Sequence, residues 1–262
     1  MSDILNTSEQ ATLATQVRAA NGFEPIPPVH DKIRDIAEAY EIQTVNRNIW
    51  LYEGRKHTGY KVAFTTLESQ QLFGTKEPVY GTLFRDMEFA NGSTIPADRL
   101  ANPKLEGEIV MELSQDLTGD TLDEAVVRAA IGAIYPALEI PDGSFSGKFN
   151  AVDMAADNAS AAGYVLGERF PLEADFDLTD IGLTMSKNGG IVDSGISANC
   201  MGSPLNVLVW LANALAAAGQ PLRASQIVFA GSLIPIIPVQ PGDSFEATVD
   251  DLGTVSCQFA AG

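Results

Sequence analysis

The spacing of hydrophobic residues changes near residue 56, and this change divides the chain into two segments. Over residues 6–22, and again over residues 42–52, apolar side chains recur at three- and four-residue steps, which is the spacing of one helix face. A proline-rich link at residues 23–30 separates the two runs. The sequence therefore predicts an N-terminal helical segment over residues 1–56.

From residue 59 onward, apolar residues alternate with polar ones or form short continuous runs, which is the pattern of β-strands. We expect strands over residues 59–65, 105–113, 133–140, 163–168, 181–186, 226–233, 244–249 and 254–259. The KNGG sequence at residues 187–190 lies between two apolar runs and predicts a tight hairpin. Residues 57–262 are thus expected to form a β-rich domain that makes one structural unit with the N-terminal helices.

Two further helices interrupt the predicted strands. TLDE at residues 121–124 is a capping box and predicts a helix that continues to about residue 133. The other helix has Ser203 as its N-cap, Pro204 as its first residue and Gly219 just past its end. Because strands and helices do not alternate in regular βαβ units, their order favours an α+β fold over a doubly wound one.

Acidic residues far outnumber basic ones, with 34 Asp and Glu against 16 Lys and Arg and a formal net charge of −18. Such a surface repels nucleic acid and anionic membranes, so neither is an expected partner. The longest apolar run, residues 206–219, is too short to span a bilayer. An anionic substrate would need a local cation to overcome the negative field.

Cysteine usage and the N-terminal sequence indicate the cellular compartment. Cys200 and Cys257 form no CxxC motif and no disulfide framework. The first ten residues lack the basic and apolar regions of a signal peptide. We therefore expect a reduced, cytoplasmic protein.

Several kinds of catalytic site are not supported by the residues present. The chain has two histidines, His30 and His57, and no G-x-S-x-G sequence for a serine nucleophile. We interpret both histidines as structural or surface residues. No GxGxxG or P-loop pattern suggests a nucleotide cofactor, and these counts of Cys and His do not support a zinc site.

Carboxylates are the remaining candidates. Glu106 and Glu108 are two residues apart on one predicted strand, so they share a face, and Glu139 lies in another apolar strand. Burying three ionised carboxylates together is costly unless a divalent cation such as Mg²⁺ or Mn²⁺ binds them. Alternatively, Glu106, Glu108 and Glu112 form a solvated strand face, and the spacing alone favours this simpler interpretation.

Lys61 lies in an alternating strand between Tyr60 and Val62. It could simply face solvent. It could also bind a substrate carboxylate or transfer a proton. Periodicity does not decide between these roles.

An ordered set of motifs resembles a known family. The motifs are GYKVAFT, YGTLFRDM, LEGEIVMEL, YPALEIPD, AADNASAAGYVLG, SPLNVLVWLAN and GDSFEATVDDLGTVSCQF. Together they resemble the 2-keto-4-pentenoate hydratase / 4-oxalocrotonate decarboxylase family of the fumarylacetoacetate hydrolase superfamily, over nearly the whole chain. The resemblance implies N-terminal helices packed on a mixed, strongly bent β-roll.

The resemblance also implies a set of site residues. Its Mg²⁺ or Mn²⁺ ligands match Glu106, Glu108 and Glu139, and its catalytic lysine matches Lys61. Substrate-binding positions match the three residues Leu83, Gly231 and Ser232. The ADN sequence that ends at Asn158 is a further family marker, which we interpret as structural.

The implied reaction is that of a metal-dependent lyase acting on a 2-oxo or 2-hydroxydienoic acid through an enolate. Hydration of a 2-keto-4-pentenoate-type acid is the first expectation. Decarboxylation of a 4-oxalocrotonate-type acid and C–C hydrolysis of an acylpyruvate are alternatives. Family hydratases usually carry an acid where this chain has Val79, and Phe145 stands where an arginine is common. Arg85 could replace that arginine, but a surface salt bridge is its expected role.

Partners are implied by the family alone. Its members form homo-oligomers, with rings of five and their doublings, and sister hydratases and decarboxylases associate. A non-enzymatic alternative is therefore a silent partner subunit of such a sister enzyme. A degenerate site is expected to lose metal ligands, whereas this chain retains all three carboxylates.

Overall fold

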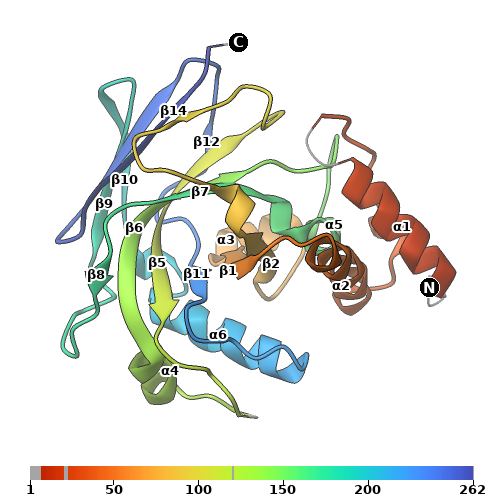
Figure 1. Ribbon diagram of the computed structural model, residues 1–262, viewed down its shortest axis with the longest axis horizontal. Helices are drawn as coiled ribbons and strands as arrows, with labels where there is room; N and C mark the ends of the chain where they lie inside the picture. The colour runs from red at the N-terminus through yellow and green to blue at the C-terminus, as the bar shows by residue number, and fades with distance from the viewer. Residues whose placement is uncertain (1–6, 21–22, 120, 262) are drawn as a thin grey trace.

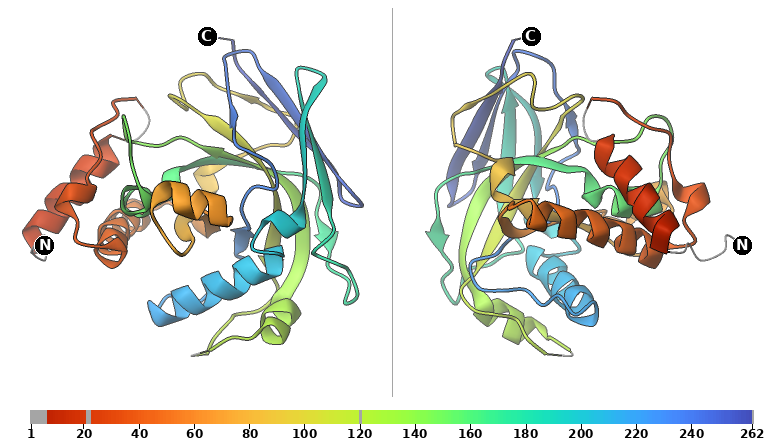
Figure 2. Two further views of the ribbon diagram at one scale, coloured as in Figure 1. Left: turned by 180° about the vertical axis from the view of Figure 1, so that it is seen from behind. Right: turned by 45° about the vertical axis from the view of Figure 1, so that its right-hand side comes forward.

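The computed structural model describes residues 7–20, 23–119 and 121–261. Helices α1 (Thr7–Ala19) and α2 (Ile36–Tyr52) pack against each other, and α2 also packs against α5 (Ala151–Ala156). Both views of Figure 2 place α1 and α2 on the side of the molecule away from the smaller sheet. Residues 6 and 22, where the first helix was expected to begin and end, lie outside the described residues.

The larger sheet has nine strands and mixed polarity. Its order is β2-β1-β11-β5-β6-β7-β3, with β12 added beside β5 and β8 beside β6. The pairs β1/β11 and β3/β7 are parallel and the other pairs are antiparallel. The strands are β1 (His57–Ala63), β2 (Val79–Phe84), β3 (Glu88–Phe89), β5 (Lys104–Leu113), β6 (Ile131–Pro141), β7 (Ala161–Leu166), β8 (Phe170–Pro171), β11 (Ile227–Phe229) and β12 (Ile237–Pro238).

The smaller sheet has five strands in the order β10-β9-β13-β14-β4. These are β4 (Thr94–Ile95), β9 (Gly182–Lys187), β10 (Gly190–Ile196), β13 (Ser244–Val249) and β14 (Gly253–Phe259). Figure 1 shows β5 and β6 as long, curved strands beside this sheet. Leu105, Ile109 and Met111 of β5 point toward it and form the main core with residues of β9 and β13. The other face of β5 is therefore left for different chemistry.

Short helices complete the fold: α3 (Leu67–Phe73), α4 (Glu124–Ala130), α6 (Pro204–Ala217), and the 3₁₀ turns η1 (His30–Lys32), η2 (Arg85–Met87), η3 (Asn158–Ser160) and η4 (Ser197–Asn199). Among the described residues, Ser197–Ala217 is the one helical run long and apolar enough to cross a membrane. Half of that run is buried inside the fold, and α6 contributes Leu208, Leu211 and Leu215 to the main core. Core packing therefore accounts for its apolar composition.

The predicted α+β fold, with helices packed on a bent mixed sheet, is confirmed. The KNGG hairpin is also confirmed, because Asn188 and Gly189 have φ of 53° and 80° between β9 and β10, as a type I′ turn requires. The α6 cap forms as predicted, with the Ser203 side chain accepting a hydrogen bond from the Leu205 N–H. The short elements α3, α5 and β2 were not predicted.

The expected helix at residues 121–133 was wrong at both ends. Asp123 is the N-cap, since its side chain accepts a hydrogen bond from the Val126 N–H. The helix ends at Ala130, because Ile131 begins β6 and pairs with β5. The capping box at residues 121–124 thus marked the right neighbourhood, but a stronger cap lay two residues further on.

The expected strand at residues 226–233 was also wrong in its second half. Strand β11 ends at Phe229, and Gly231 adopts a left-handed conformation with φ of 92°. Its N–H donates to a carboxylate of Glu108 instead of a neighbouring strand. Local β-propensity therefore fails at the point where the chain meets the cluster of acidic residues.

Candidate metal centre

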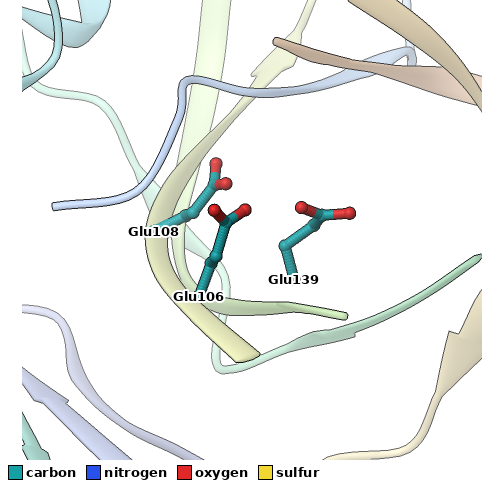
Figure 3. Close-up of side chains that lie close together, drawn as sticks. All are labelled: Glu106, Glu108 and Glu139. Carbon is teal, nitrogen blue, oxygen red and sulfur yellow. The ribbon is translucent and has the colours of Figure 1, made fainter. Parts of the chain in front are cut away.

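Three glutamates converge on one face of the β5–β6 pair, as Figure 3 shows. Glu106 and Glu108 come from β5 and Glu139 from β6. The strand register places Glu106 directly opposite Glu139. Each of the three residues offers a carboxylate oxygen within 4.8 Å of those of the others. The sequence-predicted trio is thus brought together at distances that suit a single ion.

The interpretation of Glu106, Glu108 and Glu112 as a solvated strand face is wrong for Glu108, which is fully buried. Glu108 and Glu139 have no exposed surface, and Glu106 is half-buried. Glu112 alone behaves as that interpretation expected, because it forms a part-exposed ion pair with Arg169 at 3.1 Å. The polar side chains of one strand therefore serve two different purposes.

Two buried oxygens of the trio have neither a hydrogen-bond donor nor an ion-pair partner among the described residues. These are Oε1 of Glu108 and Oε1 of Glu139. Burial of an unpaired carboxylate oxygen is costly, and three neighbouring negative charges add repulsion. A hard divalent cation with oxygen ligands would relieve both penalties. The donor set therefore fits Mg²⁺ or Mn²⁺ and does not resemble a zinc site of Cys and His.

Lys61 of β1 lies against this cluster and not in solvent. It is 2 % exposed; its Nζ lies 2.9 Å from Glu139 Oε2 and donates a hydrogen bond to the Ala159 carbonyl at 3.0 Å. Burial by itself would lower the pKa of Lys61, but the charges of the three glutamates outweigh burial and raise it. The side chain is thus an ammonium ion held beside the carboxylates.

The turn that holds the Lys61 ammonium is unusual. Asn158, Ala159 and Ser160 have φ of 53°, 53° and 55°, a left-handed conformation that is rare for residues other than glycine. The Asn158 side chain accepts from the Thr82 N–H at 2.7 Å and donates to the Thr82 carbonyl at 2.9 Å. Asn158 thereby pairs with β2 as a neighbouring strand would, and the turn directs the Ala159 carbonyl toward Lys61.

Close packing of this turn requires a glycine on β2. An ideal Cβ at Gly81 would lie 2.0 Å from the Asn158 carbonyl oxygen. Gly81 pairs with Lys61 in the β1–β2 register. Asn158, the last residue of the ADN sequence, therefore has a structural role: it anchors the turn that contacts Lys61.

The predicted substrate-binding residues occupy two different environments. Gly231 lies at the cluster, since its N–H donates to Glu108 Oε2 at 2.8 Å. Ser232 is next to it, and its hydroxyl donates to the Ile234 carbonyl at 2.7 Å. Leu83 is fully buried in an apolar cluster with Val110 and Ala137. Val110 lies two residues from Glu108 on β5 and Ala137 two residues from Glu139 on β6, so each shares a strand face with a glutamate. Leu83 therefore lies in the apolar layer that adjoins the carboxylates.

The residues that depart from the family pattern lie in an apolar region. Val79 is fully buried with Phe64 and Ala159, and Phe145 packs against the same cluster. Arg85 is 67 % exposed and pairs with Glu88 at 2.8 Å, which confirms the expected surface salt bridge. No second cation accompanies Lys61 in the buried part of the described chain.

The two histidines lie outside the cluster, in structural settings. The His30 ring contacts the buried carboxylate of Asp153 at 2.5 Å, and that carboxylate also accepts from three backbone N–H groups. The His57 ring packs edge-on against Tyr60, and burial lowers the pKa of His57 to about 4. The prediction that these residues are structural agrees with their contacts.

We expect metal binding to depend on pH. Burial, followed by the charge of Glu106, raises the pKa of Glu108 to about 8 in the metal-free protein. A metal ion must displace this proton, so the apparent Mn²⁺ affinity should rise by up to roughly tenfold per pH unit and level off near pH 8. Electron paramagnetic resonance titrations between about pH 6 and 9 would measure it; a flat profile would contradict the prediction.

The raised pKa of Glu108 also makes the stability of the metal-free protein depend on pH. Glu108 holds its proton more tightly in the folded chain than at the ordinary pKa of 4.5. The contribution of Glu108 to the free energy of unfolding is therefore fully present below pH 4.5 and is lost as the pH rises through 8. Thermal melts in chelator should show this loss, and saturating Mn²⁺ should reverse it by binding only the folded state.

Comparison with known families identifies the class of protein that has this fold and this carboxylate cluster. Residues 65–260 match the model of the fumarylacetoacetate (FAA) hydrolase C-terminal domain, so the chain belongs to the fumarylacetoacetate hydrolase family. Among its relatives, 2-keto-4-pentenoate hydratase 1 of Dechloromonas aromatica is 38 % identical and aligns over 98 % of both chains. The TodF product hydratase of Pseudomonas putida is 39 % identical over 90 % of this chain and 89 % of its own.

The solved structures place the chain in the same branch of the family. The 4-oxalocrotonate decarboxylase from Pseudomonas putida G7, complexed with magnesium and adipate, superposes with a TM-score of 0.93. It is 30 % identical, and the match covers 97 % of this chain and 98 % of that one. The resemblance to the hydratase/decarboxylase family and the bent β-roll are thereby confirmed, and the chain is an enzyme of the lyase type.

Proposed function

We propose that the protein is a metal-dependent hydro-lyase that adds water to the conjugated double bond of a 2-oxo or 2-hydroxydienoic acid. The observation that carries the proposal is the buried trio Glu106, Glu108 and Glu139, with unpaired oxygens, beside the buried Lys61 ammonium. Full-length relatives named 2-keto-4-pentenoate hydratase support the hydratase chemistry.

The three glutamates would hold Mg²⁺, or Mn²⁺ in its place. When bound, the ion supplies Lewis-acid stabilisation of the negative charge that develops on a 2-oxo acid. Oxygen ligands suit both ions, and magnesium is the ion in the decarboxylase complex with adipate. Three protein ligands leave about three octahedral positions for the substrate and water.

Lys61 would bind the anionic head of the substrate and transfer a proton at Nζ. Its ammonium is desolvated and fixed by Glu139 and the Ala159 carbonyl, so it is oriented before the substrate arrives. This cation also accounts for how a chain of net charge −18 would hold an acid. Gly231 and Ser232 would border the substrate, with Leu83 in the apolar layer beside it.

Decarboxylation is the second candidate, and Val79 favours it. Where hydratases are expected to carry an acid that handles water, this chain has a fully buried valine in an apolar cluster. Nearly complete superposition on 4-oxalocrotonate decarboxylase is compatible with either reaction. Two substrates separate these reactions.

Purified protein should be incubated with 2-hydroxypenta-2,4-dienoate and with 2-oxohex-3-enedioate, each with Mg²⁺ and with chelator. We expect Mg²⁺-dependent loss of the dienoate absorbance and formation of its hydrated product. Consumption of the second compound alone, with release of CO₂, would replace the hydratase proposal with the decarboxylase. Pyruvate released from an acylpyruvate would instead indicate C–C hydrolysis.

We also infer that the protein is a cytoplasmic homo-oligomer. The family resemblance implies a ring of five or its doubling, and association with a sister enzyme. Both cysteines are free and buried, which suits a reducing compartment. Exposed aliphatic side chains on the edge strand β10, Ile191 and Val192, offer surface for contact between copies. Light scattering of the purified protein would measure the mass; a monomer would contradict the oligomer.

A further inference from the structure

Cys200 lies directly behind the loop that contacts Glu108. Its side chain is fully buried. Its Sγ donates a hydrogen bond to the Gly231 carbonyl at 3.1 Å and a longer one to the Ser232 carbonyl at 3.6 Å. On its other side, Gly231 donates its N–H to Glu108 Oε2 at 2.8 Å. One residue of the loop therefore connects the thiol to a candidate metal ligand.

The Gly231 loop is tied to β5 on both sides of Gly231, because the Ala230 N–H donates to the Ile109 carbonyl at 3.4 Å and the Leu233 N–H donates to the Gly107 carbonyl at 2.9 Å. Gly231 has φ of 92°, and an ideal Cβ there would lie 2.4 Å from Thr65 Oγ1. The position therefore excludes a side chain that could anchor the loop. Backbone held in such a conformation persists only where surrounding contacts fix it. Between those two bonds to β5, the Cys200 thiol contacts the carbonyls of Gly231 and Ser232.

The segment that carries Cys200 is itself tied to β1. The Met201 N–H donates to the Thr65 carbonyl at 3.1 Å, and Thr65 follows the strand that carries Lys61. Phe64 and Met201 have φ of 61° and 50°, so each of these neighbouring segments contains a left-handed residue. Strain of this kind gathers where structure is held for function.

Glu108 shows what this support achieves. Its Oε2 is occupied by the Gly231 N–H, whereas its buried Oε1 has no partner among the described residues. The hydrogen bond thus fixes the orientation of the carboxylate and leaves one oxygen for a cation. Groups behind a ligand that fix its orientation affect metal affinity as strongly as many direct contacts do.

We propose that Cys200 is a positioning residue for the metal ligand Glu108 and acts through the backbone carbonyl and N–H of Gly231. The inference rests on the proposed metal site. Burial, with the nearby charge of Glu108, raises the pKa of the Cys200 thiol above its usual range, so Sγ–H remains a donor at neutral pH. The thiol contacts neither metal nor substrate in this assignment.

Cys257 provides a matched control within the same chain. It is 3 % exposed and lies in β14, on the smaller sheet, and its thiol has no hydrogen bond to any described residue. Cys257→Ala removes the same atoms from a buried site that is remote from the glutamates. It therefore measures the effect of losing a buried thiol as such.

The test is Mn²⁺ binding by the full chain, measured by electron paramagnetic resonance of free Mn²⁺. We expect Cys200→Ala to weaken Mn²⁺ binding by about tenfold, as changes behind metal ligands typically do. Cys200→Val, which fills the space of the thiol with apolar atoms and has no donor, should weaken it similarly. Cys200→Ser keeps a donor and should stay within about threefold of wild type, and Cys257→Ala should bind as wild type does.

Thermal melts in chelator show which variants fold. If Cys200→Ala does not fold, Cys200→Val is the donor-free variant that tests the proposal. Wild-type affinity in both donor-free variants would overturn the proposal, as would an equal loss in Cys200→Ser. If the wild-type protein binds no Mn²⁺, the metal site fails and the inference fails with it. That outcome is distinguishable, because it appears before any variant is compared.

Discussion

Replacing Glu108 by glutamine is expected to abolish Mg²⁺-dependent turnover and to weaken Mn²⁺ binding by more than the 10–100-fold that is typical of residues behind a ligand. The amide keeps the size of the side chain and can still accept from the Gly231 N–H. It then presents its NH₂ group, which cannot bind a cation, where the cation needs a charged oxygen. The loss would therefore report on the ligand charge and not on the packing of the strand.

Glu112→Gln is the matched control, because Glu112 lies on the same face of the same strand but pairs with Arg169 near the surface. It should retain full activity and metal affinity. In chelator, Glu108→Gln should melt no lower than wild type, since the amide is uncharged, as is the protonated Glu108 of the metal-free protein. Full Mg²⁺-dependent activity in Glu108→Gln would refute the metal assignment.

Replacing Lys61 by methionine is expected to lower kcat by about 10²–10⁴-fold, the usual contribution of a positioned proton-transfer group. Its effect on metal binding should have the opposite sign from that of Glu108→Gln. Lys61 Nζ lies 2.9 Å from Glu139 Oε2 and competes with a cation for that carboxylate. Mn²⁺ affinity should therefore stay the same or rise, as calorimetric titration can measure.

The metal-free Lys61→Met protein should also be less stable than wild type, because the buried Glu139 loses the cation that pairs with it. Added Mn²⁺ should restore much of this loss. Lys104→Met is the control, because Lys104 begins β5 and its ammonium bonds only to Asn102 among the described residues. Unchanged kcat in Lys61→Met would exclude Lys61 from the chemistry.

Local sequence signals determined much of the fold. The hairpin at Asn188–Gly189 and the cap at Ser203 formed as predicted, because turn and cap geometry depend on a few adjacent residues. The helix near residue 124 was displaced, since Asp123 competed with Thr121 as the cap and Ile131 was drawn into the β5–β6 ladder. Element ends are where tertiary pairing overrides local preference.

The candidate site was only half visible in local patterns. The spacing of Glu106 and Glu108 predicted a shared face but could not distinguish a solvated face from a buried one. Periodicity likewise left Lys61 undecided. The ordered family motifs, spread along the chain, were the signal that joined these residues to Glu139. No sequence pattern indicated Cys200, because a single buried thiol has no distinctive spacing.

The sequence by itself determined the α+β class, most strand positions, the tight turns and the types of residue available for chemistry. Only the tertiary structure placed Glu139 opposite Glu106, buried Lys61 beside them and bent the chain at Gly231 toward Glu108. The physical reason is the distance along the chain over which each effect acts. Turns, caps and periodicity act over a few residues, whereas burial and electrostatic pairing depend on which distant strands meet.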